Sequence, residues 1–405
     1  MLLASPFAQF GFNGLKFFNA FNTFIAIVFT YKIVRKLKIE NDWLVLFILS
    51  FSPLYYVLTY SALTEPLFAA ILALSIYLMI ESKLKWALIL ISFLPFVRSE
   101  GLILIAVFVF YLFQIEEIKK TIYLLLGSVV YSIAGYFVYH DFLWVFTKIP
   151  YATIEHVYGS GSIFHFAQQL FYIIGAPICA LFVVGLLSLL VNFFQKKIHP
   201  EIHYIILAGF ISFFIAHTLF WYLGIFGSMG LQRVFIAVMP LIGIIALEGF
   251  NFIFHFIQVN RMAKNLIKTL IILYLVIFPF TNNPAAINWE KDMRLSEELK
   301  LAQKTSKFII DKNLNNQRII FNHHYFFILL NIDKYEGHHY YGLCQENYQD
   351  LKPNDVIIWD NRYSETESKI KKTDLDTNRL LKQVYAEHRH QFGQESHFVV
   401  YQRLK

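Results

Sequence analysis

The sequence predicts an α-helical polytopic membrane protein of about ten transmembrane helices, followed by a small α/β domain outside the membrane. Of the 405 residues, 57% are hydrophobic, and the mean hydropathy is +0.50, which is too apolar for a soluble chain of this length. Long apolar runs alternate with short polar loops as far as residue 280. Beyond that point charged residues become frequent, and no apolar run is long enough to cross a bilayer.

The apolar runs define the expected spans. Phe and Tyr are abundant, with 43 and 24 copies, as is usual at lipid-facing and interfacial positions. The ten expected spans are residues 16–31, 43–59, 66–80, 84–97, 101–115, 121–139, 167–194, 203–222, 232–256 and 267–280.

Basic residues gather in alternate loops, which predicts the orientation. The loops at 32–38, 83–85, 119–120, 196–197 and 261–268 hold 13 of the 17 basic residues that precede position 281. By the positive-inside rule these loops are cytoplasmic, so the remaining loops and the tail after 281 are expected outside. This pattern is typical of an integral protein of a bacterial inner membrane. The net charge of +7 therefore reflects topology, and no nucleic-acid partner is expected.

The stretch from Tyr60 to Gly101 contains the main candidate site. It reads as two short apolar helices joined by a polar turn, so its two far ends should meet on the outer side. Those ends carry Glu65, Arg98 and Glu100. Charges so close to short spans often mark a functional site. The alternative, that Arg98 and Glu100 only neutralise each other in a loop, stays open.

Two other outer segments carry polar candidates. The loop 140–166 reads as an interfacial helix with Asp141, Glu155 and His156. Either acidic residue could act as a base, although surface solvation explains both equally well. Arg233 stands at the outer start of a span, where it either reaches toward the interface or binds an anion such as phosphate. We expect Glu65, Arg98, Glu100 and Arg233 to line one outward cavity.

The tail, residues 281–405, is predicted to be the separate α/β domain. An apolar stripe over 290–312 indicates an amphipathic helix, and RIIFN, NDVIIWD and HFVVYQRL read as strands, with a helical SETESKIKK between them. The pairs His323–His324 and His338–His339 invite a metal interpretation, but neighbouring residues rarely ligate one ion together. Asp360, at a strand end, is a site candidate or a turn cap. Cys179 and Cys344 imply no disulfide framework.

Several motifs resemble the GT-C superfamily of polytopic glycosyltransferases, and most of all its mannosyltransferase branch. TEPLF at an outer span start precedes VRSEG at the next outer turn. QRVFIAVMPLIG is similar to a later outer helix start of that family, and FGFNGLKFFNAFNTFIAIVFTYKIVRKL resembles the segment after its first outer loop. The resemblance covers about residues 1–280.

The resemblance implies transfer of a mannose-like hexose from a polyprenyl-phosphate donor to a glycan, lipid or protein acceptor outside the membrane. By this resemblance Arg98 or Arg233 holds the phosphate. Glu155 and His156 of the outer loop are further substrate-binding candidates, independent of the resemblance. Glu65 or Glu100, the catalytic candidates, positions the sugar or acceptor. The family base lies between the first two spans, yet no acidic residue precedes Glu40 here. We therefore expect a native N-terminus with one more span and an acidic loop; a natural short form is the alternative.

Two other functional classes remain. A transporter or flippase of lipid-linked sugars would also need polar groups facing outward, but inverted repeats and mid-membrane charges are not evident. A non-catalytic subunit of a glycan assembly system would keep the fold and lack the base. Membrane lipids are expected partners in every case. No cofactor is implied with certainty, and a divalent metal stays an open alternative.

Overall fold

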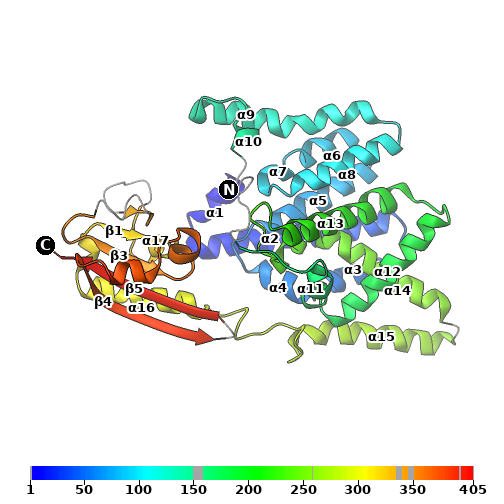
Figure 1. Cartoon of the computed structure of the whole chain (residues 1–405). Helices are drawn as coiled ribbons and strands as arrows, with labels where there is room; N and C mark the ends of the chain where they lie inside the picture. Colours follow the sequence, from blue (N-terminus) through cyan, green and yellow to red (C-terminus); the bar gives the residue numbers. More distant parts are fainter. Residues whose placement is uncertain are drawn as a thin grey trace. The chain divides into compact units, whose positions relative to one another are not determined.

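A computed structural model of the chain describes residues 2–148, 158–257, 259–333, 340–344, 351–391 and 394–404. The chain divides into two compact units, Met1–Asn288 and Trp289–Lys405, each described by itself (Figure 1). Unit 1 is helical. Its elements are η1 (Leu2–Ala4), α1 (Ser5–Ala8), α2 (Gly11–Lys36), α3 (Leu44–Ser50), α4 (Pro53–Thr59), α5 (Glu65–Ile80), α6 (Leu84–Ile91), α7 (Leu94–Val97), α8 (Gly101–Gln114), η2 (Ile118–Leu125), α9 (Leu126–Tyr139), α10 (Trp144–Thr147), α11 (His165–Ile174), α12 (Ala176–Phe194), η3 (Glu201–Leu207), α13 (Ala208–Leu223), η4 (Gln232–Val238), α14 (Met239–Phe256), α15 (Arg261–Ile277) and η5 (Phe278–Phe280).

Six helices in the described part of the chain are long and apolar enough to cross a membrane. They are Gly11–Lys36, Ile118–Tyr139, Ala176–Phe194, Glu201–Leu223, Gln232–Phe256 and Arg261–Phe280. The protein is therefore a polytopic helical membrane protein with six candidate spans. Each of the six overlaps one of the ten expected spans.

The other four expected spans are shorter helices. Residues 66–80, 84–97 and 101–115 correspond to the apolar helices Glu65–Ile80, Leu84–Val97 and Gly101–Gln114. The expected span 43–59 divides into α3 and α4, because Pro53 opens a new helix after an extended Ser52. The expected span 167–194 is likewise divided, at Gly175, whose φ of +81° no helix accommodates.

Two helix pairs approach closely through small residues. Ala26 of α2 packs with Ala69 and Ala70 of α5. A Cβ atom added to Gly185 of α12 would stand 1.8 Å from the Ile245 carbonyl oxygen of α14, and one added to Gly249 would stand 1.9 Å from that of Leu181. Small residues let helix backbones come together in this way, as is common in membrane proteins.

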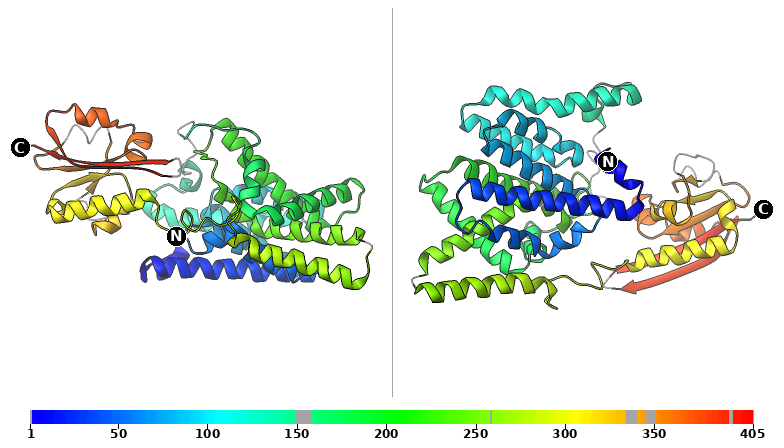
Figure 2. Two further views of the ribbon diagram at one scale, coloured as in Figure 1. Left: turned by 90° about the horizontal axis from the view of Figure 1, so that it is seen from below. Right: turned by 180° about the vertical axis from the view of Figure 1, so that it is seen from behind.

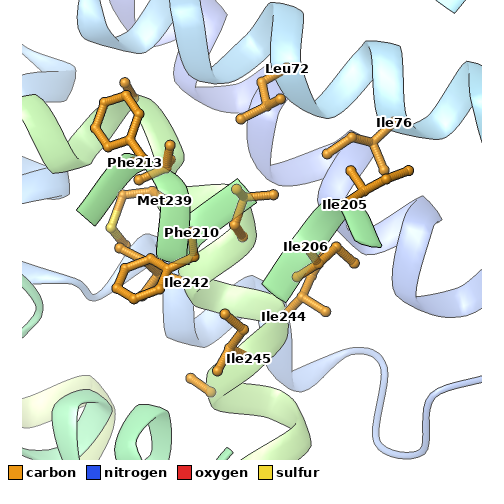
Figure 3. Packing of buried hydrophobic residues seen from close by; sticks show 14 of the residues in the cluster. Leu72, Ile76, Ile205, Ile206, Phe210, Phe213, Met239, Ile242, Ile244 and Ile245 are labelled. Carbon is orange, nitrogen blue, oxygen red and sulfur yellow. The ribbon is translucent and has the colours of Figure 1, made fainter. Parts of the chain in front are cut away.

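The core of unit 1 forms where α5, η3, α13 and α14 meet. Figure 3 shows side chains from these elements packed against one another, including Leu72, Ile76, Ile205, Phe210 and Ile244. Helix α14 is the most enclosed, since every residue from Met239 to Leu247 is buried. A helix that is apolar on all sides belongs inside a bundle.

Helices α2 and α5 run side by side in the same direction. The Asn19 side chain of α2 donates to the Leu63 carbonyl just before α5, and Lys36 at the other end of α2 pairs with Glu81 just after α5, at 2.8 Å. Unit 1 therefore has two distinct ends, which we call the Glu65 end and the Lys36 end. At the Lys36 end, Lys268 of α15 donates to Asn41.

Unit 2 is a mixed five-stranded sheet with helices on its faces. Its elements are α16 (Glu297–Asp311), η6 (Leu314–Asn316), β1 (Ile319–Phe321), α17 (Tyr325–Leu329), β2 (Tyr340–Tyr341), β3 (Val356–Asp360), η7 (Tyr363–Glu367), α19 (Lys372–Asp376), β4 (Leu381–Gln391) and β5 (Gln394–Arg403). The strand order is β2-β1-β3-β5-β4. Strand β1 is parallel to β2 and β3, while β5 is antiparallel to β3 and β4.

Each face of this sheet has its own apolar layer. Ile319 and Phe321 of β1 pack with Leu301 and Ile309 of α16, whereas the alternate residue Ile320 packs on the other face. The left view of Figure 2 shows the sheet edge-on, with α16 in yellow along one face and the orange segment that includes α19 along the other. Continuous apolar runs such as VIIW of β3 are typical of strands covered on both faces.

Several expectations for the tail need correction. The amphipathic helix is α16, which begins at Glu297 rather than at residue 290, because Ser296 caps it by accepting from the Leu299 amide. The expected helix SETESKIKK is helical only through the short η7. Strand β4 was not expected, because its residues LKQVYAEHRHQ are mostly polar.

Candidate functional site

Glu65 opens helix α5 at the centre of the site. Thr64 is the N-cap residue, and Pro66 occupies the first turn, where its missing N–H leaves no helical hydrogen bond unmade. A carboxylate in the first turn also interacts favourably with the helix dipole. The side chain of Glu65 is nevertheless 0% exposed, which is rare for a charged group unless it is paired.

Arg98 reaches Glu65 from a tight turn between α7 and α8. The residue is extended, with φ −152° and ψ 138°, so it ends α7. Gly101 then starts α8 so close to α7 that an added Cβ would lie 2.5 Å from both the Leu94 carbonyl carbon and the Pro95 nitrogen. Only glycine fits there, and this close approach fixes where Arg98 stands.

Arg98 connects two carboxylates. Its Nη1 lies 2.9 Å from Oε1 of Glu65, and its Nη2 donates to Oε1 of Glu100 at 2.8 Å. A longer contact of 3.4 Å joins Nη1 to the Thr64 hydroxyl. The Arg98–Glu100 pairing that the sequence left open is therefore present, and it is extended to a second, buried carboxylate.

Arg233 brings a third element to Glu65. Its Nε lies 3.5 Å from Oε1 of Glu65. The backbone leading to η4 is held by α11, because Gln232 donates to the Gln169 side chain and the His165 ring nitrogen lies 2.9 Å from the Gly230 carbonyl oxygen. We call Glu65, Arg98, Glu100 and Arg233 the Glu65 cluster.

The Glu65 cluster is electrically balanced but not fully bonded. Its two cations and two anions cancel, which lowers the cost of placing charges in an apolar bundle. The exposed fractions of the other three side chains are 19% for Arg98, 17% for Glu100 and 38% for Arg233. Oε2 of Glu65 and Nε of Arg233 are buried without a hydrogen-bond partner among the described residues. The cluster can thus accept further polar contacts, with Arg233 as its most accessible charge.

Three further sequence-predicted candidates, Asp141, Glu155 and His156, come from the expected outer loop 140–166. Glu155 and His156 lie outside the described residues, together with the rest of 149–157. Asp141 accepts from the Leu143 amide and the Thr147 hydroxyl, both at 2.8 Å, so its side chain bonds to both ends of the turn that forms the short helix α10. These bonds give Asp141 a structural role.

Asp360 in unit 2 also caps a turn. Its Oδ1 accepts from the amides of Arg362 and Tyr363, and its Oδ2 accepts from the Ser364 hydroxyl at 3.1 Å. Burial raises the pKa of this carboxyl above its ordinary value, although those bonds and His323 oppose the shift. In the described parts of the chain, no group of three or more His, Cys, Asp or Glu is placed to hold a metal ion. His338 and His339 lie outside those parts, and neither Cys179 nor Cys344 forms a disulfide.

One buried residue near the Glu65 cluster, His217, was not among the candidates expected from the sequence. His217 in α13 is 6% exposed, and the charges of Glu100 and Arg98 act on its ring. A histidine within an apolar span is unusual enough to have been noted on that ground alone.

Comparisons with known proteins identify no relative. No family model matches the chain, and no curated protein or solved structure matches it. The class of the protein, a polytopic helical membrane protein with six candidate spans, therefore rests on its own helices.

Proposed function

We propose that this protein is a membrane glycosyltransferase of the GT-C type, which transfers a mannose-like hexose from a polyprenyl-phosphate donor to an acceptor at the outer face. The observation that carries the proposal is the meeting of three distant motifs at one buried carboxylate. TEPLF supplies Glu65, VRSEG supplies Arg98 and Glu100, and QRVF supplies Arg233. These are motifs on which the resemblance to that superfamily rests.

The burial of each member suggests its role. Glu65 has no exposed surface, so we assign it the task of holding the two guanidinium groups in position. Arg233 is the most accessible cation, and we propose that it binds the donor phosphate with help from Arg98. Glu100 keeps part of its surface exposed, and we propose that it contacts the acceptor hydroxyl.

The reaction would be a displacement at the anomeric carbon. The acceptor oxygen forms the new bond to that carbon, and its proton passes to a carboxylate, for which Glu100 is our candidate. The bond from the anomeric carbon to the phosphate oxygen breaks, and polyprenyl phosphate leaves with the electron pair. Arginine side chains fixed beside the departing phosphate would stabilise its growing negative charge.

The location of the Glu65 cluster suits a lipid-borne donor. Helix α5 has 16 residues and α8 has 14, so they rise about 24 and about 21 Å against a hydrocarbon core of about 30 Å. The shortness of these helices supports a cluster recessed below the membrane surface. Because basic residues gather at the Lys36 end, we propose that the Glu65 end and the tail face outward.

Cysteine labelling in intact cells tests the orientation. A single cysteine at position 366 should react with an impermeant thiol reagent, whereas cysteines at positions 84 and 197 should react only after the membrane is permeabilised. Reaction at 84 or 197 in intact cells, or protection at 366, contradicts the proposed topology.

A transfer assay tests the function. The full chain in proteoliposomes should release polyprenyl phosphate from polyprenyl-phosphate mannose when acceptor is present. Arg98→Ala and Arg233→Gln should each reduce the rate by about 100-fold, because each removes a donor that is aimed at the leaving phosphate. Lys148→Ala is the matched control, since Lys148 is an exposed cation whose ammonium lies over the Tyr139 ring.

Three results would overturn the proposal. Equal losses in the Lys148 and Arg233 variants would show that the Glu65 cluster has no special part. Movement of the labelled lipid across the bilayer without cleavage of its sugar–phosphate bond would favour a flippase instead. Absence of both activities would leave the non-catalytic subunit.

A further inference from the structure

His217 lies at the boundary between the Glu65 cluster and an aromatic layer. Its ring centroid is 4.5 Å from that of Phe213, 6.0 Å from that of Phe235 and 6.2 Å from that of Phe166. Those three phenyl rings are essentially without exposed surface. Phe235 belongs to η4, two residues after Arg233, so this packing places His217 next to the element that carries Arg233. His217 is thus a polar side chain of this aromatic layer that lies next to the element carrying Arg233.

The imidazole has an unused polar atom. Its Nε2 is buried and has no hydrogen-bond partner among the described residues. A phenylalanine would fill the same space among the phenyl rings without burying a polar nitrogen, so packing alone does not account for a histidine. An unpaired nitrogen beside a charged site is instead suited to a polar group that arrives with a ligand.

Neighbouring side chains limit where such a ligand could lie. On the next turn of α13, the Trp221 ring packs against the chain at Gly161 and Gly230, where added Cβ atoms would come within 1.8 and 2.8 Å of it. That side of α13 is therefore closed by backbone. The polar region next to His217 is the Glu65 cluster, because Phe235, which packs on the imidazole, follows Arg233 by two residues in η4.

We propose that His217 binds a ring hydroxyl of the hexose on the lipid-linked donor, while the arginines bind the phosphate. This inference rests on the proposed function and adds a sugar subsite to it. A hydroxyl can donate to or accept from an imidazole nitrogen, so either tautomer serves. The Glu100 carboxylate, which keeps part of its surface exposed, would repel an acidic sugar. The expected donor sugar is therefore a neutral hexose.

The ratio of the affinities for the donor with and without its sugar measures the sugar contact alone. The purified full chain is titrated with polyprenyl-phosphate mannose and, separately, with polyprenyl phosphate. The wild type should bind the mannose form about tenfold more tightly, as expected for about one well-placed hydrogen bond to a buried group. His217→Phe should bring the ratio of the two affinities close to one and leave the affinity for polyprenyl phosphate unchanged. His217→Gln, which retains a polar group, should restore part of the ratio.

His203 supplies the matched control. It is also buried, at 4% exposure, its Nε2 also lacks a partner among the described residues, and its ring stacks on Phe193. It differs in lying at the Lys36 end, where its Nδ1 contacts the His199 backbone. His203→Phe should leave the affinity ratio at the wild-type value.

The outcomes separate this inference from the function it rests on. If the wild type binds neither lipid, the proposed function fails and the sugar subsite fails with it. If the wild type binds both lipids equally, or if His217→Phe keeps the ratio, the sugar subsite alone is wrong. An equal loss of ratio in the His203 variant also overturns it, because a general loosening of the bundle would then explain the result. Thermal unfolding of each variant shows that it is folded.

Discussion

Two carboxylates, one in each unit, are bridged in the same manner but in different surroundings. Glu65 is contacted by Arg98 and Arg233 at 2.9 and 3.5 Å. Glu298 of α16 is contacted by His323 at 3.4 Å and by Arg362 at 3.0 Å. In both cases the two basic side chains come from separate elements, so each carboxylate fastens three parts of the fold together.

The two clusters differ in burial and in completeness. Glu65 is 0% exposed, whereas the Glu298 side chain is 20% exposed and that of Arg362 is 53% exposed. Among the described residues, buried atoms without hydrogen-bond partners occur at Glu65 and Arg233, but none occurs in the Glu298 trio. A complete, partly solvated cluster is explained as a structural clamp. An incomplete, buried one costs stability, and that cost points to a functional reason for keeping it.

The largest expected effect follows from removing the shared charge at Glu65. Glu65→Gln should lower the free energy of unfolding of unit 1 by about 3–5 kcal/mol, because it leaves Arg233 without its anion and Arg98 with only one. Thermal or chemical unfolding in detergent micelles measures the change. Lys36 and Glu81 provide the control, because the side chains of that pair are 53% and 26% exposed. Glu81→Gln should cause no measurable change, and a loss equal to that of Glu65→Gln would refute the contrast.

A substitution that leaves every charge in place should have the next largest effect. Gly101→Ala forces a Cβ against the α7 backbone at 2.5 Å and must displace the turn that carries Arg98. Overpacking of this kind costs about 1–3 kcal/mol. Gly209→Ala is the control, because its Cβ would meet only side-chain ends, that of Leu241 at 3.1 Å and that of Leu104 at 3.8 Å. If both variants unfold alike, the position of Arg98 does not depend on Gly101.

Much of the Glu65 cluster could be predicted from the sequence, since charges are scarce in an apolar chain. Glu65, Arg98 and Arg233 stand out at span ends, and alternation of basic loops places those ends on one side. The sequence could not show that Glu65 is shared by two arginines. That arrangement depends on how η4 packs against the start of α5, and contacts between distant segments leave no local pattern.

Helix breaks and cross-element contacts account for most of the remaining errors. Two of the expected spans each combined two helices, α3 with α4 and α11 with α12, because their apolar runs are nearly continuous. Pro53 and Gly175, which commonly interrupt helices, mark both breaks in the sequence. Strand β4 was missed because its polar residues do not alternate cleanly, and its pairing with β5 decides its structure. Glu298 could not be recognised as a shared ion-pair partner from the sequence, because an acidic residue in the first turn of a helix is common.

The Glu298 cluster should respond more weakly than the Glu65 cluster. Glu298→Gln should destabilise unit 2 by about 1 kcal/mol, because its partners can turn to solvent when the carboxylate is lost. Hydrogen exchange of the α16 backbone in the full chain measures this effect locally. Lys372 and Asp376 form a partly exposed pair at 2.6 Å outside α16, so Lys372→Gln is a suitable control and should leave exchange in α16 unchanged. A loss as large as that of Glu65→Gln would mean that burial is not what separates the two clusters.

The smallest expected effect is a loss of unit 2 stability at acid pH, which tests whether the Glu298 cluster acts through its charge. Burial opposes ionisation of Glu298, yet the hydrogen bond with His323 and the charge of Arg362 together hold its pKa below the ordinary value of about 4.3. A lowered carboxyl pKa contributes stability above the unfolded-state pKa, and this stability disappears as the pH falls through the folded-state pKa. Asp360, whose pKa is raised by burial, acts in the opposite sense, so the total acid response of unit 2 mixes the two groups.

The difference in α16 exchange protection between wild type and Glu298→Gln isolates the contribution of Glu298. Asp360 is the same in both proteins, so its contribution cancels. The extra protection of α16 that the Glu298 charge gives the wild type should shrink below about pH 4 and vanish once Glu298 is protonated. Hydrogen exchange at a series of pH values, corrected for the intrinsic rate, gives this curve. A difference that is independent of pH would show that Glu298 stabilises unit 2 by packing and not by its charge.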